Sequence, residues 1–144
     1  RVYPTMTADE VLQRLGDTAD VVPLGTVGPS IIDRMDAEQA MCLIDDRGEG
    51  YLIRVVPSAV QGVRDLDGAV LEHLLGATDV HYEHDLNSIL HAALPSGSSA
   101  VLIRPVGVDE ILRTATTGEL MPPKSTFFTP KLATGVVMRD VGAQ

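Results

Sequence analysis

The chain has 144 residues, enough for one domain with a substantial core and too few for two. Its net charge of −9 disfavours general nucleic-acid binding, because acidic side chains repel a phosphate backbone. No stretch approaches the ~20 apolar residues of a membrane span, and the single Cys42 cannot form an internal disulfide, so we expect a soluble domain of the reducing cytoplasm with neither nucleic-acid nor membrane partners.

The first part of the chain predicts a helix, an edge strand and a hairpin. A capping box that begins at Thr7 is followed by apolar residues at helical spacing, which predicts a helix ending at Gly16. Residues 21–24 can form one brief edge strand, since a proline and glycines interrupt the region. Residues 40–45 and 51–56 are aliphatic and β-branched and flank a polar, glycine-containing turn, so they predict a β-hairpin.

A second helix and two strand-helix units are expected after the hairpin. Leucines and a valine recur at helical spacing up to Gly76, behind a potential Asp65 cap. The predicted units are strand 80–83 with helix 85–94 and strand 100–104 with helix 108–117, and residues 135–141 form a last strand. Right-handed crossovers would make the connected strands parallel. We therefore expect an α/β or α+β fold of one domain, 1–144, with a mixed sheet and helices mainly on one face.

The last predicted helix is amphipathic. Val108, Ile111, Leu112 and Ala115 line one of its faces. Such a face normally packs on apolar neighbours, so we expect this helix to cover the sheet.

The loop at 121–131 is the first candidate for a binding site, because it holds both lysines and both phenylalanines of the chain. Its three prolines predict a stiff segment. The lysines supply charge, the adjacent hydroxyls donate hydrogen bonds, and a phenylalanine packs the loop or stacks on a ligand. The candidate ligand-binding residues are Lys124, Ser125, Thr126, Phe127, Phe128 and Lys131. The alternative is a structural strap whose phenylalanines dock into the core.

A second cluster contains metal-capable side chains, namely His81, Glu83, His84, Asp85 and His91. Their spacing does not favour convergence on one ion, and neither HExxH nor CxxC is present. The ordinary interpretation makes Asp85 a helix N-cap, with the histidines at the junction and on the surface. No GxSxG motif provides a nucleophile, so we expect no metal site, the catalytic residues stay unknown, and the sequence indicates no particular cofactor.

The segment Met-Pro-Pro-Lys-Ser-Thr-Phe-Phe-Thr-Pro-Lys at 121–131, continued by Leu-Ala-Thr-Gly-Val-Val, closely resembles the C-terminal signature of a prokaryotic family, the domain of unknown function numbered 1015. The similarity extends back through residues 100–105, 82–85 and 65–71 in the family's order. Family members are considerably longer and carry an upstream Asp-Gly-His-His-Arg motif similar to that of ParB-like domains, some of which phosphorylate free serine or other small molecules. This chain lacks that motif.

The resemblance implies that the chain is the C-terminal domain or a fragment of a larger protein, an expectation that the absence of an initiator Met before Arg1 also favours. We expect the loop at 121–131 to contribute to binding a phosphorylated small molecule or nucleotide in a ParB-like, kinase-like parent, with the parent's N-terminal domain as a partner. The alternative is a non-catalytic module that docks on that domain or on another protomer. Neither expectation makes the chain alone catalytic.

Overall fold

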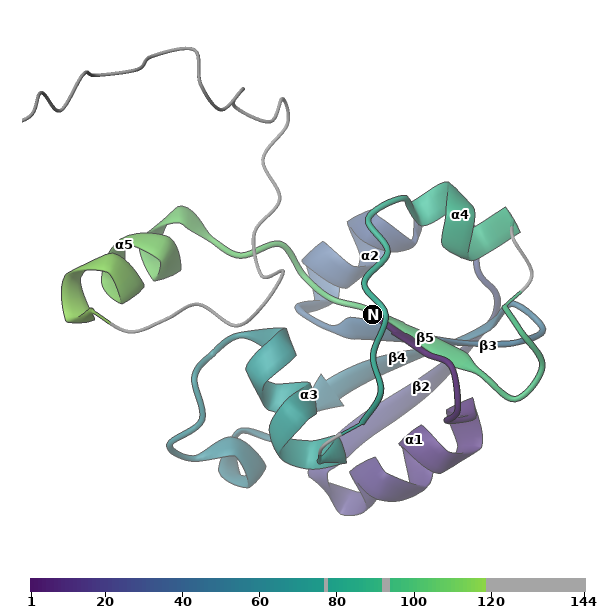
Figure 1. Ribbon diagram of the computed structural model, residues 1–144, viewed down its shortest axis with the longest axis horizontal. Coiled ribbons are helices and arrows are strands. Elements are labelled where there is room, and N and C mark those ends of the chain that lie inside the picture. The colour runs from purple at the N-terminus through teal and green to yellow at the C-terminus, as the bar shows by residue number, and fades with distance from the viewer. Residues whose placement is uncertain (77, 92–93, 119–144) are drawn as a thin grey trace, which may run out of the picture.

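A five-stranded antiparallel sheet forms the centre of the protein (Figure 1). The computed structural model describes residues 1–76, 78–91 and 94–118. The strands lie in the order β1-β5-β3-β4-β2, and all four pairings are antiparallel. Their bounds are β1 Val2–Tyr3, β2 Ala19–Thr26, β3 Met41–Asp45, β4 Glu49–Val55 and β5 Ser99–Leu102.

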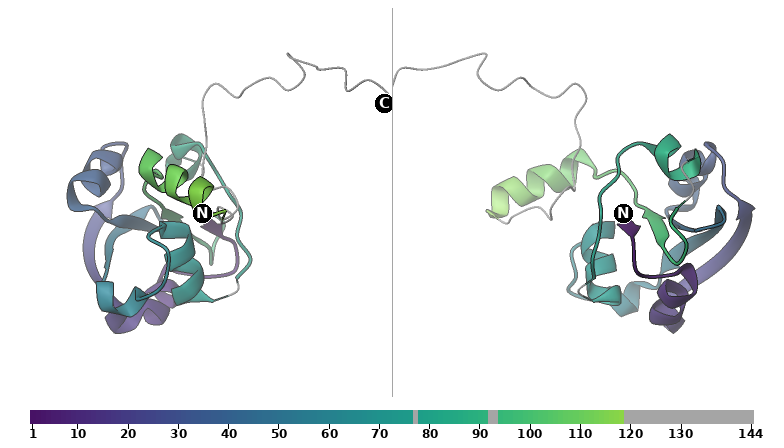
Figure 2. Two further views of the ribbon diagram at one scale, coloured as in Figure 1. Left: turned by 90° about the vertical axis from the view of Figure 1, so that its left-hand side faces the viewer. Right: turned by 45° about the vertical axis from the view of Figure 1, so that its right-hand side comes forward.

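Four helices pack on the two faces of the sheet, namely α1 Ala8–Leu15, α2 Ile31–Glu38, α3 Asp67–Leu75 and α4 Leu86–His91. The fifth described helix is α5 Val108–Thr117, and short 3-10 turns lie at Gly16–Thr18 and Pro57–Val60. One core cluster joins α1 and α3 to the side of the sheet that carries Leu43 and Val101. The other joins α2 and α4 to the side that carries Cys42 and Ala100. Figure 2 shows the sheet and the helices on its two faces from further directions.

The predicted first helix and hairpin agree with the structure, whereas the edge strand expected at 21–24 is longer, as β2 covers Ala19–Thr26. Thr7 and Glu10 form the capping box, with the Glu10 amide donating to Thr7 Oγ1 at 3.2 Å and the Thr7 amide donating to Glu10 Oε2 at 2.8 Å. The hairpin is β3 with β4, in which Met41 lies opposite Ile53. The α/β class is therefore confirmed, and among the described residues no helix is both long and apolar enough to span a bilayer.

The predicted sheet arrangement was wrong in three respects. Parallel neighbours were expected, but β5 lies between β1 and β3 and pairs antiparallel with both. Residues 80–83 contribute only an isolated bridge between His81 and Val2. The helices cover both faces rather than mainly one, because α2, which the sequence analysis did not predict, buries Ile31 and Met35 on the second face.

The Asp65 cap was also wrong. The N-cap of α3 is Leu66, which has no side chain able to accept a backbone hydrogen bond. The predicted strand at 135–141 lies outside the described residues.

Candidate functional site

The predicted ligand-binding loop lies outside the described part of the chain. This applies to Lys124, Ser125, Thr126, Phe127, Phe128 and Lys131. Two other regions of the described chain are therefore candidates for a functional site. One is a surface cleft whose residues the sequence analysis did not propose as ligand-binding, and the other is the surface of α5.

Two of the candidate metal residues near α4, Glu83 and Asp85, accept local hydrogen bonds. Glu83 Oε1 accepts from the amides of His84 at 2.7 Å and Asp85 at 2.9 Å, and these bonds lower the pKa of the Glu83 carboxyl. Asp85 accepts from the Asn87 amide at 3.0 Å and from Ser88 Oγ at 2.8 Å, as the interpretation of Asp85 as an N-cap predicts. Within residues 1–76, 78–91 and 94–118, no three His, Cys, Asp or Glu side chains are grouped to hold a metal ion.

A buried carboxylate and an arginine meet beside α3. Arg104 Nη2 donates to Asp67 Oδ1 at 2.6 Å, and the Arg104 amide donates to Asp67 Oδ2 at 2.7 Å. Arg104 Nε bridges both oxygens at 3.1 and 3.2 Å. The Asp67 side chain is 4% exposed and that of Arg104 is 31% exposed, so the pair joins the core to a surface cleft. The same hydrogen bonds raise the pKa of the Arg104 guanidinium.

Gln39 forms the rim of this cleft in an unusual backbone conformation. It ends α2 with φ 48° and ψ 47°, and it is the only non-glycine described with a positive φ. Its Nε2 donates to the Asp36 carbonyl at 2.7 Å, and its Oε1 accepts from Arg104 Nη1 at 3.3 Å. The left-handed conformation is unfavourable for a residue with a Cβ. Here it places the side chain between α2 and Arg104.

Two hollows adjoin at the Asp67–Arg104 pair. The first, of about 470 Å³, has the exposed carboxylates of Asp36, Asp65 and Asp109 on its walls. The second, of about 510 Å³, has a mostly aliphatic wall. That wall contains Met41, Ile53, Val55, Pro57, Val60, Val63 and Val70. Besides the Asp67–Arg104 pair, the first hollow is lined by the four carboxylates of Asp36, Asp65, Asp109 and Glu110 and by the single guanidinium of Arg113, so a phosphate there would meet net repulsion.

The arginines around the cleft are ion-paired in the same way. Arg54 contacts Glu38, whereas Arg64 and Arg113 both contact Glu110. Each of these guanidinium groups therefore contacts a carboxylate, and Arg64 and Arg113 share that of Glu110. The cleft thus presents paired arginines and not a concentrated cationic patch.

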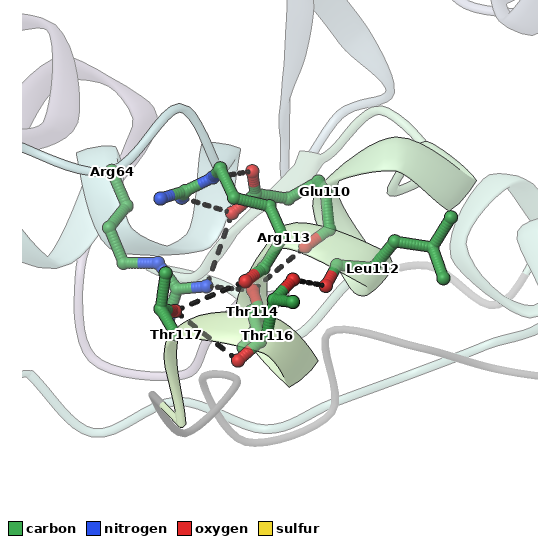
Figure 3. A network of polar contacts seen from close by, with 7 residues as sticks. All are labelled: Arg64, Glu110, Leu112, Arg113, Thr114, Thr116 and Thr117. Carbon is green, nitrogen blue, oxygen red and sulfur yellow. Dashed lines mark hydrogen bonds and ion pairs between the residues drawn. The ribbon is translucent and has the colours of Figure 1, made fainter.

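Helix α5 is joined to the body by its polar side. Arg64 Nη2 donates to Glu110 Oε1 at 3.1 Å and to Thr114 Oγ1 at 2.5 Å (Figure 3). Thr114 is 3% exposed. Arg113 donates twice to Glu110, each bond 2.7 Å long, and together with Arg64 it lowers the pKa of the Glu110 carboxyl to about 2. The attachment of α5 therefore includes a network of charged hydrogen bonds.

The apolar side of α5 faces away from that network. Val108 is 70% exposed and Leu112 61% exposed, the two highest values among the large hydrophobic residues described as exposed. Leu112 points away from Arg64 in Figure 3, and α5 stands off the sheet in Figures 1 and 2. The expectation that this helix covers the sheet was wrong. Burial of Thr114 beside Arg64 turns the side of the helix that carries Val108 and Leu112 outward, whereas Ile111 is half-buried.

Sequence reasoning found the apolar face of α5 but missed the Asp67–Arg104 pair. The helical spacing of its apolar residues reveals the face of α5. Asp67 and Arg104, in contrast, lie 37 positions apart and belong to no recognisable motif. No family model, curated protein or solved structure matches the chain. The geometry of these residues alone therefore carries the functional argument.

Proposed function

We propose that the chain is an interaction module whose contact surface is the outward face of α5. We call this face, made by Val108, Ile111, Leu112 and Ala115, the α5 stripe. The observation that carries the proposal is its orientation, because an amphipathic helix normally directs such a stripe to the core. Here Val108 and Leu112 of the stripe are exposed to solvent while Ile111 is half-buried, and none of the four residues belongs to either core cluster.

The free energy available on this surface is substantial for so short a helix. Covering a fully exposed valine or leucine contributes about 1.5–3 kcal/mol each. Val108 and Leu112 are both largely uncovered, so a partner that buries them gains most of that amount. The ion pair between Glu110 and Arg64 restricts the motion of α5 in the unbound chain, which reduces the conformational entropy lost on binding.

The partner that we propose is the N-terminal domain of a larger parent or another protomer. Among the described residues, no three His, Cys, Asp or Glu side chains are grouped to hold a metal ion. The only cysteine among them, Cys42, is a buried thiol whose pKa burial raises to about 12. These features support a binding role for this part of the chain rather than nucleophilic or metal chemistry.

Binding of a phosphorylated small molecule or nucleotide through the loop at 121–131 stays a prediction. The arginines of the cleft are already paired with carboxylates, so the positive charges that neutralise the phosphate would have to come from Lys124 and Lys131. The proposal of an α5 contact does not depend on that ligand.

Thiol labelling tests whether the stripe is open for a partner. The Leu112→Cys variant is labelled at about 1 µM, a concentration too low for a weak complex between two copies to form. We expect its new thiol to react as fast as that of an Ile32→Cys control. Ile32 is a large exposed residue on α2, at 43% exposure. Both thiols should react at least about 100-fold faster than buried Cys42. A thiol at position 112 as protected as Cys42 would reject the proposed contact surface.

A further inference from the structure

The two hollows of the cleft differ in character but share part of their walls. Gln39, Asp65, Asp67 and Arg104 line both of them. We call them the acidic hollow, of about 470 Å³, and the aliphatic hollow, of about 510 Å³. Each lies within the range of about 300–1,000 Å³ that is typical of sites for small molecules. A ligand that occupies both therefore contacts two unlike surfaces at once.

The aliphatic hollow is built on the core. Met41, Ile53 and Val70 on its wall are buried members of the core cluster beneath α1 and α3. Val60 and Val63 are only half-buried, so part of the apolar wall stays uncovered. The three arginines and three carboxylates that also line this hollow carry no net charge. Hydrocarbon is therefore the chemistry that this hollow fits best.

The acidic hollow carries an excess of negative charge. Five carboxylates and two guanidinium groups line it, those of Asp67 and Arg104 included. The carboxylates of Asp36, Asp65 and Asp109 are exposed and form no hydrogen bond or ion pair with another residue that the structure describes. A cation that enters this hollow therefore gains their attraction without displacing an existing partner.

We infer that the cleft binds a small organic cation with an aliphatic body, whose ammonium group lies in the acidic hollow and whose hydrocarbon lies in the aliphatic hollow. Charge complementarity selects this class of ligand. An anion with the same body meets the carboxylates of the acidic hollow, and a neutral hydrocarbon uses only the aliphatic one. The inference goes beyond the proposed function and does not involve the α5 stripe.

The affinity should be modest and dependent on salt. Octylammonium, an unbranched eight-carbon amine that is charged at neutral pH, is a suitable probe. A ligand of this size that makes a single charged contact is expected to bind with a dissociation constant of about 0.1–1 mM. Added salt should weaken its binding, because the three carboxylates are exposed and are screened by ions.

Calorimetric titration of the full chain tests the preference for a cation. Octylammonium and octanoate both contain eight carbons and carry opposite charges. At low salt, octylammonium should bind at least about tenfold more tightly than octanoate. Ethylammonium, which has the charge but not the long chain, should not bind up to about 5 mM. Equal affinities for octylammonium and octanoate, or no binding of octylammonium up to about 5 mM, would overturn the inference.

NMR of the methionine methyl groups locates the ligand. Met41 lines the aliphatic hollow, whereas Met35 packs in the core cluster on the other face of the sheet. In a chain with isotope-labelled methionine methyl groups, octylammonium should shift the signal of Met41 and leave that of Met35 in place. A titration that leaves the Met41 signal unchanged would place the ligand elsewhere, for example on the α5 stripe, and would reject this site.

Paired charge variants test the acidic hollow. D36N/D65N removes two of its exposed carboxylates and should weaken octylammonium binding by about threefold or more. D17N/D20N changes the net charge equally at exposed positions that line neither hollow, and it should leave the affinity within about twofold. An equal loss in both variants would show that only the net charge of −9 attracts the ligand.

Filling the aliphatic hollow tests the other half of the site. Val63→Phe places a larger side chain on its wall and should weaken octylammonium binding about tenfold. Val22→Phe, the same change on the exposed surface of β2, should have no effect. Circular dichroism verifies that both variants are folded. Unchanged binding by a folded Val63→Phe chain would reject the aliphatic hollow, and the charge variants decide if that chain does not fold.

These outcomes are independent of the proposed function. A protected thiol at position 112 would reject the α5 contact surface and leave the cleft site standing. Failure of octylammonium to bind would reject the cleft site and leave the α5 stripe as proposed.

Discussion

Asp67 and Arg104 lie 37 positions apart in the sequence, yet the buried Asp67 carboxylate accepts from both the backbone and the guanidinium of Arg104. This contact fixes the first turn of α3 to the segment that follows β5. It thereby links a helix on one face of the sheet to the chain that leads into α5.

Replacing Asp67 by Ala should lower the free energy of unfolding by roughly 2 kcal/mol. The loss is expected to be smaller than for a fully buried pair, because Arg104 is partly exposed and can gain water. Urea denaturation monitored by circular dichroism measures the change. Asp65→Ala is the matched control, since Asp65 is an exposed neighbour in the same cleft. Similar midpoints for the two variants would contradict a stabilising role for the Asp67–Arg104 contact.

A substitution at Gln39 should instead stabilise the protein. Glycine adopts a φ of 48° without the steric penalty that a Cβ brings, so Gln39→Gly should raise the free energy of unfolding by roughly 0.5–1 kcal/mol. Gln39→Ala removes the same side-chain hydrogen bonds but keeps the penalty, and it should give no increase. The thermal melting temperatures of the two variants provide the comparison. If alanine stabilises as much as glycine, the backbone conformation is not the cause.

Acid should weaken the attachment of α5 only well below neutral pH. The pKa of the Glu110 carboxyl falls from 4.5 to about 2 in the folded state, chiefly through Arg113 and then Arg64. A lowered folded-state pKa contributes stability that is fully present above the unfolded value of 4.5 and is lost as the pH falls toward 2. Hydrogen exchange at the Thr114 amide should therefore accelerate between pH 4.5 and 2, beyond the intrinsic pH dependence of exchange.

A Glu110→Gln variant is the control for this titration. It keeps a hydrogen-bonding side chain without the titrating carboxylate, so its excess acceleration in acid should disappear. Acceleration of the same size in both proteins would show that another group governs the attachment of α5.

The Cys42 thiol should be inert in the folded protein. Burial raises its pKa to about 12, and its side chain lies in the core cluster beneath α2 and α4. A chromogenic disulfide reagent at neutral pH should not react with the native chain and should react completely in denaturant. Rapid reaction of the native protein at a rate independent of added urea would show that the thiol is accessible without unfolding.

The sequence alone indicated those elements whose signals are local. The capping box at Thr7 places its partners three residues apart, and the hairpin joins strands separated by a short turn, so neighbouring residues determine both. The limits of α5, from Val108 to Thr117, also agree with the predicted helix. Helical spacing identified the α5 stripe for the same reason.

Only the tertiary structure decided how these elements are arranged. The placement of β5 between β1 and β3, the use of both sheet faces, and the Asp67–Arg104 contact depend on residues far apart in the sequence. The direction of the α5 stripe is the clearest case. Periodicity states which side of a helix is apolar, but the exposure of Val108 and Leu112 followed from the burial of Thr114 against Arg64, 50 residues before Thr114 in the chain.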